Sequence, residues 1–214
     1  CSSRRSNEKD KHVQFTRHSE HGLVVCNSWA VGHARFSSLD LFNASAKEAI
    51  KKMNTFEPQA ISNTVWSYAR VGHASPDLFN AAAEEAIKKI STFNSQGNIA
   101  NTVWSYATVE HASPALFNAA AEEAMKKIST FNLQDISNTV WSYATVGHVS
   151  PALFNAAAEE AIKKISTFNS QEIANTVWSY ATVGRASPDL FNAAADEAMV
   201  KMSTFNSQHI SNTV

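Results

Sequence analysis

The sequence has 214 residues, of which 18 are Lys or Arg and 19 are Asp or Glu, so its formal net charge at pH 7 is −1. This balance excludes the strongly basic proteins that bind nucleic acid through bulk charge alone. With 44% hydrophobic residues the chain can bury a large core, but no apolar run approaches the roughly 18 residues that a membrane span needs, and the cysteines Cys1 and Cys26 are too few for a disulfide framework or a zinc ligand set.

The N-terminal segment differs from the rest of the chain. Residues 1–22 are polar and mixed in charge, and we expect them to form a disordered tail. Residues 23–31, around Trp29, have the pattern of a degenerate second helix from an earlier unit. The repeat array therefore spans residues 23–214, and we expect it to be truncated at the C-terminus because the chain stops one residue before the next expected tryptophan.

A unit of 37 or 38 residues repeats along the chain. Tryptophan recurs with this period at Trp66, Trp104, Trp141 and Trp178. Phenylalanine keeps the same steps at Phe42, Phe79, Phe117, Phe154 and Phe191. The 38-residue step comes from one inserted residue in the segment Gln96–Ile99. A fixed period in this range is typical of solenoid architectures.

The first helix of each unit begins beside a proline. Ser75, Ser113, Ser150 and Ser187 each precede a proline, which places a good N-cap next to a residue tolerated at the first helical position. The apolar periodicity predicts first helices at about 39–53, 76–90, 114–128, 151–165 and 188–202. Their acidic residues, such as Glu84 and Glu85, fall on the predicted solvent side and precede Lys88 and Lys89 by four residues.

The second helix of each unit begins at an asparagine: Asn94, Asn132 or Asn169. The last two have an acid three residues later, as in a capping box. It ends near Gly72, Gly147 or Gly184, which suit a left-handed C-terminal position. Because apolar residues cover about half of this helix, it must pack against its partner and its neighbours. The sequence therefore predicts an all-α protein, a right-handed α-α solenoid of about five hairpins of 37–38 residues.

The repeated motif resembles a known family of organellar proteins. The run S-P-x-L-F-N-A-A-A-E-E-A-I-K-K-I-S-T-F-N-S-Q-x-I-A-N-T-V-W-S-Y-A-T-V-G is similar to the octotricopeptide repeat, and to related repeats of FAST-kinase-like, RAP-domain and RNA-editing substrate-binding complex proteins. The resemblance covers residues 39–214. It implies an RNA-binding protein of mitochondria or chloroplasts that acts in transcript stability, processing or translation. The C-terminal RAP domain of many such relatives is absent from this stretch.

Two polar columns lie in the second helices. The asparagines are Asn63, Asn101, Asn138, Asn175 and Asn212, and the serines one turn later are Ser67, Ser105, Ser142 and Ser179. Asparagine is a poor helix former in mid-helix, so we predict either amides that contact RNA bases or a ladder of amides bonded between units. Because the side chains are the same in every unit, RNA binding through them would have little sequence preference.

The charges of the repeat body argue against strong phosphate binding. Residues 39–214 contain twelve Lys and Arg against sixteen Asp and Glu, a formal net charge of −4. The candidates for phosphate contacts are the lysines near the ends of the first helices, chiefly Lys88, Lys126 and Lys163. The alternative is a solvated face in which these lysines pair with neighbouring glutamates.

The tryptophans and histidines also form columns. The tryptophans could stack on unpaired bases, but regular spacing within an apolar arc favours a place in the core. His33, His73, His111 and His148 follow the second helices, and their wide separation lacks local zinc-ligand spacing, so we expect them to interact with the helix C-termini and predict no metal.

These patterns favour a binding protein over an enzyme. The sequence has no phosphate-binding glycine loop, no H-E-x-x-H motif and no recognisable nucleophile with its base, and we predict no cofactor. We predict a non-enzymatic protein that binds single-stranded RNA of an organellar transcript, with protein partners in a ribonucleoprotein complex and no membrane contact. The alternative function is an α-solenoid scaffold for protein–protein interaction, which the acidic repeat body favours.

Overall fold

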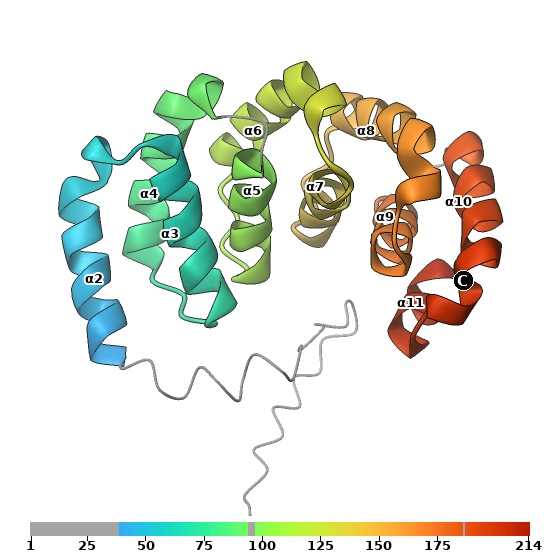
Figure 1. Cartoon of the computed structure of the whole chain (residues 1–214). Helices are drawn as coiled ribbons and strands as arrows, with labels where there is room; N and C mark the ends of the chain where they lie inside the picture. Colours follow the sequence, from blue (N-terminus) through green and yellow to red (C-terminus); the bar gives the residue numbers. More distant parts are fainter. Residues whose placement is uncertain (1–38, 94–96, 186) are drawn as a thin grey trace, which may run out of the picture.

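The computed structural model describes residues 39–93, 97–185 and 187–214, and every regular element in these residues is a helix. The helices follow one another along an arc (Figure 1). The predicted tail at residues 1–22, the degenerate helix at 23–31 and the proposed cap Asn94 lie outside the described residues. None of the described helices is long and apolar enough to span a bilayer.

Each unit consists of a first helix, a short 3-10 turn and a second helix. The first helices are α2 (Leu39–Lys52), α4 (Pro76–Lys89), α6 (Pro114–Lys127), α8 (Pro151–Lys164) and α10 (Pro188–Lys201). The second helices are α3 (Pro58–Arg70), α5 (Asn98–Thr108), α7 (Leu133–Thr145), α9 (Ser170–Thr182) and α11 (Ser207–Thr213). The 3-10 turns are η2 (Met53–Thr55), η3 (Ile90–Thr92), η4 (Ile128–Thr130), η5 (Ile165–Thr167) and η6 (Met202–Thr204). The predicted first helices agree with these bounds to about one residue.

The helices form two layers. The second helices pack side by side in the order α3, α5, α7, α9, α11, and the first helices pack in the order α2, α4, α6, α8, α10. Figure 1 shows the second helices along the inner side of the arc and the first helices along its outer side. The predicted α-solenoid of five hairpins is confirmed for the described residues.

An aromatic pair joins the two helices in each of the first four hairpins. In the second hairpin the Tyr106 hydroxyl donates a hydrogen bond to the Phe79 carbonyl at 2.6 Å, and the two rings meet edge to face with centroids 5.0 Å apart. Both side chains are fully buried. The same arrangement occurs in the pairs Tyr68–Phe42, Tyr143–Phe117 and Tyr180–Phe154. A buried hydroxyl is tolerated here because the carbonyl satisfies its hydrogen bond.

The helices begin where predicted, but the predicted N-cap side chain does not always make a capping hydrogen bond. Ser75 takes the extended N-cap conformation before Pro76, yet its hydroxyl makes no capping bond. Its carbonyl instead accepts the Phe79 amide at 3.0 Å, and the missing N–H of proline leaves one donor fewer to cap. The two predicted capping boxes, Asn132–Asp135 and Asn169–Glu172, are both confirmed.

The second unit departs from the common pattern at both ends of its second helix. Gly72, Gly147 and Gly184 adopt the predicted left-handed conformation, but the residue in this place after α5 is Glu110, with φ of 56°. At the other end α5 begins at Asn98 behind the left-handed Gly97. The predicted start of this helix at Asn94 is therefore wrong, because the inserted residue is absorbed by a glycine turn rather than by a capping box.

Candidate functional site

Each of the helices α3, α5, α7 and α9 exposes one stripe of residues on its side away from the first helices. The stripe has a residue at steps of four, three and four, so its members lie on one helix face. We call it the inner stripe, and its residues are Gln59, Asn63, Trp66, Arg70, Asn101, Trp104, Thr108, Gln134, Asn138, Trp141, Thr145, Gln171, Asn175, Trp178 and Thr182. All are exposed or half-buried, whereas the other faces of these helices pack against neighbouring helices. Figure 1 shows these second helices on the inner side of the arc, so a stripe that faces away from the first helices faces that side.

The tryptophans belong to this stripe and not to the core. Trp66 is 41% exposed, and Trp104, Trp141 and Trp178 are half-buried. The prediction of core tryptophans is thus wrong. The buried aromatic position is the tyrosine two residues later, and residues two apart point about 200° apart on a helix, so a helix that turns Tyr106 toward the first helices turns Trp104 away from them.

The asparagine amides of the middle units have no protein partner. No hydrogen bond joins the side chains of Asn101, Asn138 or Asn175 to another described residue. Only the end copies accept a bond, and it comes from a glutamine four residues earlier in the same helix, such as Gln59 to Asn63 at 3.0 Å. The alternative of an amide ladder between units is not what the described residues show. The half-buried amides of the three middle units keep their donors and acceptors available.

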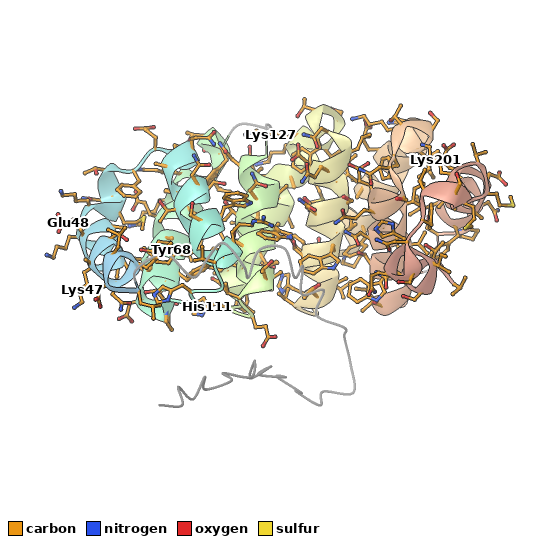
Figure 2. The ribbon with its side chains drawn as sticks, turned by 60° about the horizontal axis from the view of Figure 1, so that its bottom comes forward. Lys47, Glu48, Tyr68, His111, Lys127 and Lys201 are labelled. Atoms are coloured by element: carbon orange, nitrogen blue, oxygen red, sulfur yellow. The ribbon has the colours of Figure 1, made fainter. Side chains whose placement is uncertain are left out.

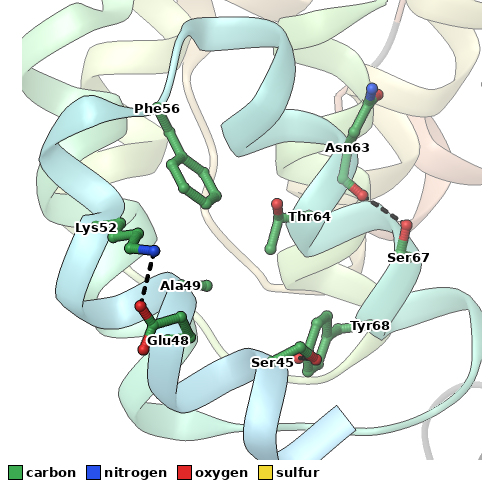
Figure 3. Close-up of a pocket in the computed structure, with 9 residues that line it drawn as sticks. All are labelled: Ser45, Glu48, Ala49, Lys52, Phe56, Asn63, Thr64, Ser67 and Tyr68. Carbon is green, nitrogen blue, oxygen red and sulfur yellow. Dashed lines mark hydrogen bonds and ion pairs between the residues drawn. The ribbon is translucent and has the colours of Figure 1, made fainter. Parts of the chain in front are cut away.

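The predicted serines lie behind the stripe. Ser105, Ser142 and Ser179 are fully buried between second helices. Each hydroxyl donates to the carbonyl of the asparagine four residues earlier, as Ser105 does to Asn101 at 2.6 Å. Ser67 makes the same bond to Asn63 but is exposed, because no unit precedes it in the described residues (Figure 3). The three buried serines are therefore outside any surface that a ligand could contact.

The predicted lysines are exposed but already paired. Lys88, Lys126 and Lys163 lie in the last turn of the first helices, in the layer opposite to the inner stripe. Each ammonium group is about 3 Å from a glutamate three residues earlier, namely Glu85, Glu123 and Glu160. Lys88 thus pairs with Glu85 and not with Glu84. The lysines lie on the first helices and the asparagines on the second helices, so the two predicted groups do not share one helix face.

The second lysine of each pair bonds to the preceding unit, a role that our sequence analysis did not predict. Lys164 donates to the carbonyls of Ser129 and Phe131, at 3.2 and 2.7 Å, across the boundary to the preceding unit. The same bonds are made by Lys89, Lys127 and Lys201. A sequence signal exists, because the last unit replaces the first lysine of the pair by the exposed Val200 but keeps Lys201.

Each of these lysine pairs is held by one largely buried glutamate. Hydrogen bonds from Lys89 and then Lys88 hold the pKa of Glu85 below its usual range, and Lys127 and Lys164 have the leading effect on Glu123 and Glu160. The capping acids behave in the opposite way, because burial raises the pKa of Asp135 and Glu172. Charge pairing therefore dominates at the boundary between units, and desolvation dominates at the caps.

Acid should weaken the contacts between units. A carboxyl whose pKa is lower in the folded state stabilises that state above its unfolded pKa, about 4.3 for glutamate, and this stability is lost as pH falls further. We expect the melting temperature to fall steeply below about pH 4.3, and the fall to be shallower in the Glu123→Gln variant. Thermal unfolding followed by circular dichroism between neutral and acidic pH tests this. An unchanged slope in the variant would contradict it.

The histidine column joins the two helices in each of the first three hairpins. The His111 ring lies 2.8 Å from the Asn80 side chain of the paired first helix, and His148 contacts Asn118 in the same way. Figure 2 shows His111 at the edge of the array. In the fourth hairpin Arg185 takes this place and donates to Asn155. The predicted interaction with the helix C-terminus is made by the backbone, because the His111 amide donates to the Tyr106 carbonyl at 3.0 Å, while the ring bridges to the first helix. No cluster of three potential metal ligands occurs among the described residues.

A pocket of about 580 Å³ opens between α2 and α3, beside Glu48, Lys52 and Phe56 (Figure 3). Ser45 and Ala49 also line it, and the positions that match them in the next unit, Ala82 and Ala86, are fully buried. The pocket is therefore a surface for stacking units that no described residue covers, and it does not have the features of a ligand site.

The inner stripe is almost uncharged. Arg70 is its only charged member, and its guanidinium group lies 5.6 Å from the centre of the Trp66 ring. The rest of the stripe offers amides, threonine hydroxyls and indole rings. Such a surface can form hydrogen bonds and stack on planar groups, but it offers little attraction for phosphate.

Comparison with known proteins identifies two relationships. A family model described as RNA-editing substrate-binding complex 6 protein matches residues 4–163. A second family model, described as a protein of unknown function (DUF1601), matches residues 178–214. The comparison with curated proteins gave no match.

Proposed function

Because this chain belongs to the RNA-editing substrate-binding complex 6 family, we propose that it is a non-enzymatic subunit that binds single-stranded RNA on its inner stripe. The family name concerns a complex that binds RNA-editing substrates. The single observation that carries the proposal is the row of unpartnered amides at Asn101, Asn138 and Asn175. Amides in this arrangement can donate to and accept from the edges of unpaired bases, as helical repeat proteins do with RNA.

The proposal extends to the setting of the protein. We propose a mitochondrial location and protein partners within the same complex, in keeping with the family. The chloroplast alternative has no support. The octotricopeptide-like motif and the resemblance to FAST-kinase-like and RAP-domain repeats fit the same function, since those repeats also belong to organellar RNA-binding proteins.

The proposed RNA site contains fewer residues than the sequence analysis predicted. It contains Asn63, Asn101, Asn138 and Asn175, and it omits the three buried serines. Lys88, Lys126 and Lys163 remain candidates for peripheral phosphate contacts, but each would have to leave or share its glutamate to make one. The formal charge of −4 on residues 39–214 favours a second function, a scaffold for protein partners, on the outer side of the arc.

Removing two central amides tests the proposal. We expect the double variant Asn101→Ala, Asn138→Ala to weaken binding of a labelled single-stranded RNA by about 10-fold. Each substitution removes an amide whose hydrogen bonds to the RNA contribute about 0.5–1.5 kcal/mol. Fluorescence anisotropy measures the dissociation constant. The matched control is Asn54→Ala, an exposed asparagine outside the inner stripe, which should bind as the unmodified chain does. Absence of RNA binding at low salt by the unmodified chain would overturn the proposed function.

A further inference from the structure

We infer that Trp66, Trp104, Trp141 and Trp178 form a stacking column for the unpaired bases of single-stranded RNA, and that the phosphates of the strand face away from the protein. This inference rests on the proposed function. It adds that the protein contacts the bases of the RNA and that stacking on the indole rings holds them. The neighbouring stripe residues would then recognise base edges while the indoles contact base faces.

The exposure of the indoles is the first observation. A helical repeat buries its large aromatic side chains wherever packing allows, and here Tyr106, Tyr143 and Tyr180 are fully buried while the tryptophan two residues earlier is not. Trp66 leaves 41% of its surface in contact with solvent. A column of partly exposed indoles in successive units is therefore a surface without its partner.

The neighbourhood of the indoles is the second observation. An asparagine lies three residues before each tryptophan, close to it on the same helix face, and in the middle units its amide is unpartnered. An indole beside a free amide can contact the face of one base and the edge of that base or the next. Stacking tolerates any base, which agrees with the sameness of the stripe from unit to unit.

Charge decides the orientation of the strand. Arg70 is the only cation of the stripe, and residues 39–214 are acidic as a whole. Phosphates directed at this surface would lose their hydration without gaining ion pairs. The orientation with uncharged bases inward and phosphates in solvent avoids that cost.

The spacing of the units adds a constraint. Neighbouring packed helices lie roughly 8–10 Å apart, whereas bases stacked on each other are about 3.4 Å apart. Bases on two successive tryptophans therefore cannot also stack directly on each other. The column requires a splayed single strand and excludes a duplex, whose bases are already paired and stacked.

A strand without bases gives the first test. Anisotropy titrations compare a labelled RNA of about 12 nucleotides, a length within the range of single-strand sites, with an otherwise identical strand of abasic residues and with the same sequence as a duplex. We expect binding of the intact strand only. We also expect log Kobs to change with log salt by a slope no steeper than about −1, because each phosphate contact on a single strand contributes roughly −0.7.

Substitution of the indoles gives the second test. Trp66→Ala should weaken RNA binding by between about 5-fold and 150-fold, the range for loss of one stacked base, and Trp66→Phe should recover part of that loss. Circular dichroism and thermal unfolding establish that both variants remain folded, which the high exposure of Trp66 favours. Thr145→Ala, an exposed member of the stripe without a ring, is the control for stacking and should have a smaller effect.

The outcomes separate this inference from the proposed function. If the intact strand binds but the abasic strand binds equally well with a steep salt slope, phosphates carry the affinity and the inference is wrong while RNA binding stands. The same holds if folded Trp66→Ala and Trp104→Ala variants bind as well as the unmodified chain. If the intact strand does not bind at all, the proposed function fails and the inference fails with it.

Discussion

Replacing Lys164 by methionine is expected to destabilise the array by about 2 kcal/mol, between the range for an exposed ion pair and that for a buried one, because 28% of its side chain is exposed. The ammonium group donates to Ser129 and Phe131 carbonyls and pairs with Glu160 at 2.9 Å. Burial raises the pKa of Asp135, and the nearby Lys164 cation offsets part of that rise. Methionine keeps the length of the side chain, so the loss reports on the polar contacts and not on a cavity.

The adjacent Lys163 is the matched control for this substitution. It contacts the other oxygen of Glu160 at 3.2 Å, but 67% of its side chain is exposed, and exposed ion pairs contribute between about 0 and 1 kcal/mol. Lys163→Met should therefore shift the midpoint of urea unfolding only slightly, and Lys164→Met should shift it strongly. Equal shifts would show that the contacts across the unit boundary do not stabilise the array.

The second large effect is expected at Tyr106. Tyr106→Ala removes a fully buried ring that packs edge to face on Phe79, and loss of an aromatic side chain from a core costs about 3–5 kcal/mol. Tyr106→Phe keeps the ring and removes only the hydrogen bond to the Phe79 carbonyl, at a cost of about 0.5–1.5 kcal/mol. The two variants thus separate packing from hydrogen bonding.

Thr108 provides the control on the same helix. It is an exposed member of the inner stripe, so Thr108→Ala should change the free energy of unfolding by less than about 0.5 kcal/mol. Urea denaturation followed by circular dichroism measures all three variants. If Tyr106→Ala were no more destabilising than Thr108→Ala, the assignment of the tyrosine as the core aromatic residue would be wrong.

The sequence predicted the helices well because their ends are chemically marked. Prolines after Ser75 and its equivalents, the capping boxes and the left-handed glycines act within a few residues, so they can be recognised without the fold. The prediction failed at α5, where one inserted residue replaced a side-chain cap by the turn at Gly97. The residue three after Asn94 is Gly97, which has no side chain to complete a capping box.

The candidate site was predicted in part. The asparagine column was identified by its mid-helix position and lies on the inner stripe, whereas Ser105 and its equivalents are buried between helices. One turn of helix separates the two columns, so the periodicity alone could not determine which of them faces solvent. Likewise Lys88 and Lys89 are identical neighbours in the sequence, yet only Lys89 crosses to the preceding unit.

The period, the caps and the apolar spacing are local properties that recur in every copy, so they are sufficient to predict a stacked helical pair of 37 or 38 residues. Which side of the wide apolar arc is buried depends on the contacts between helices. Packing of the second helices against two neighbours and the first-helix layer buries Tyr106 and leaves Trp104 at the inner surface. Those contacts join residues about one unit apart in the sequence, and no local pattern encodes the choice between two aromatic residues that are both apolar enough for a core.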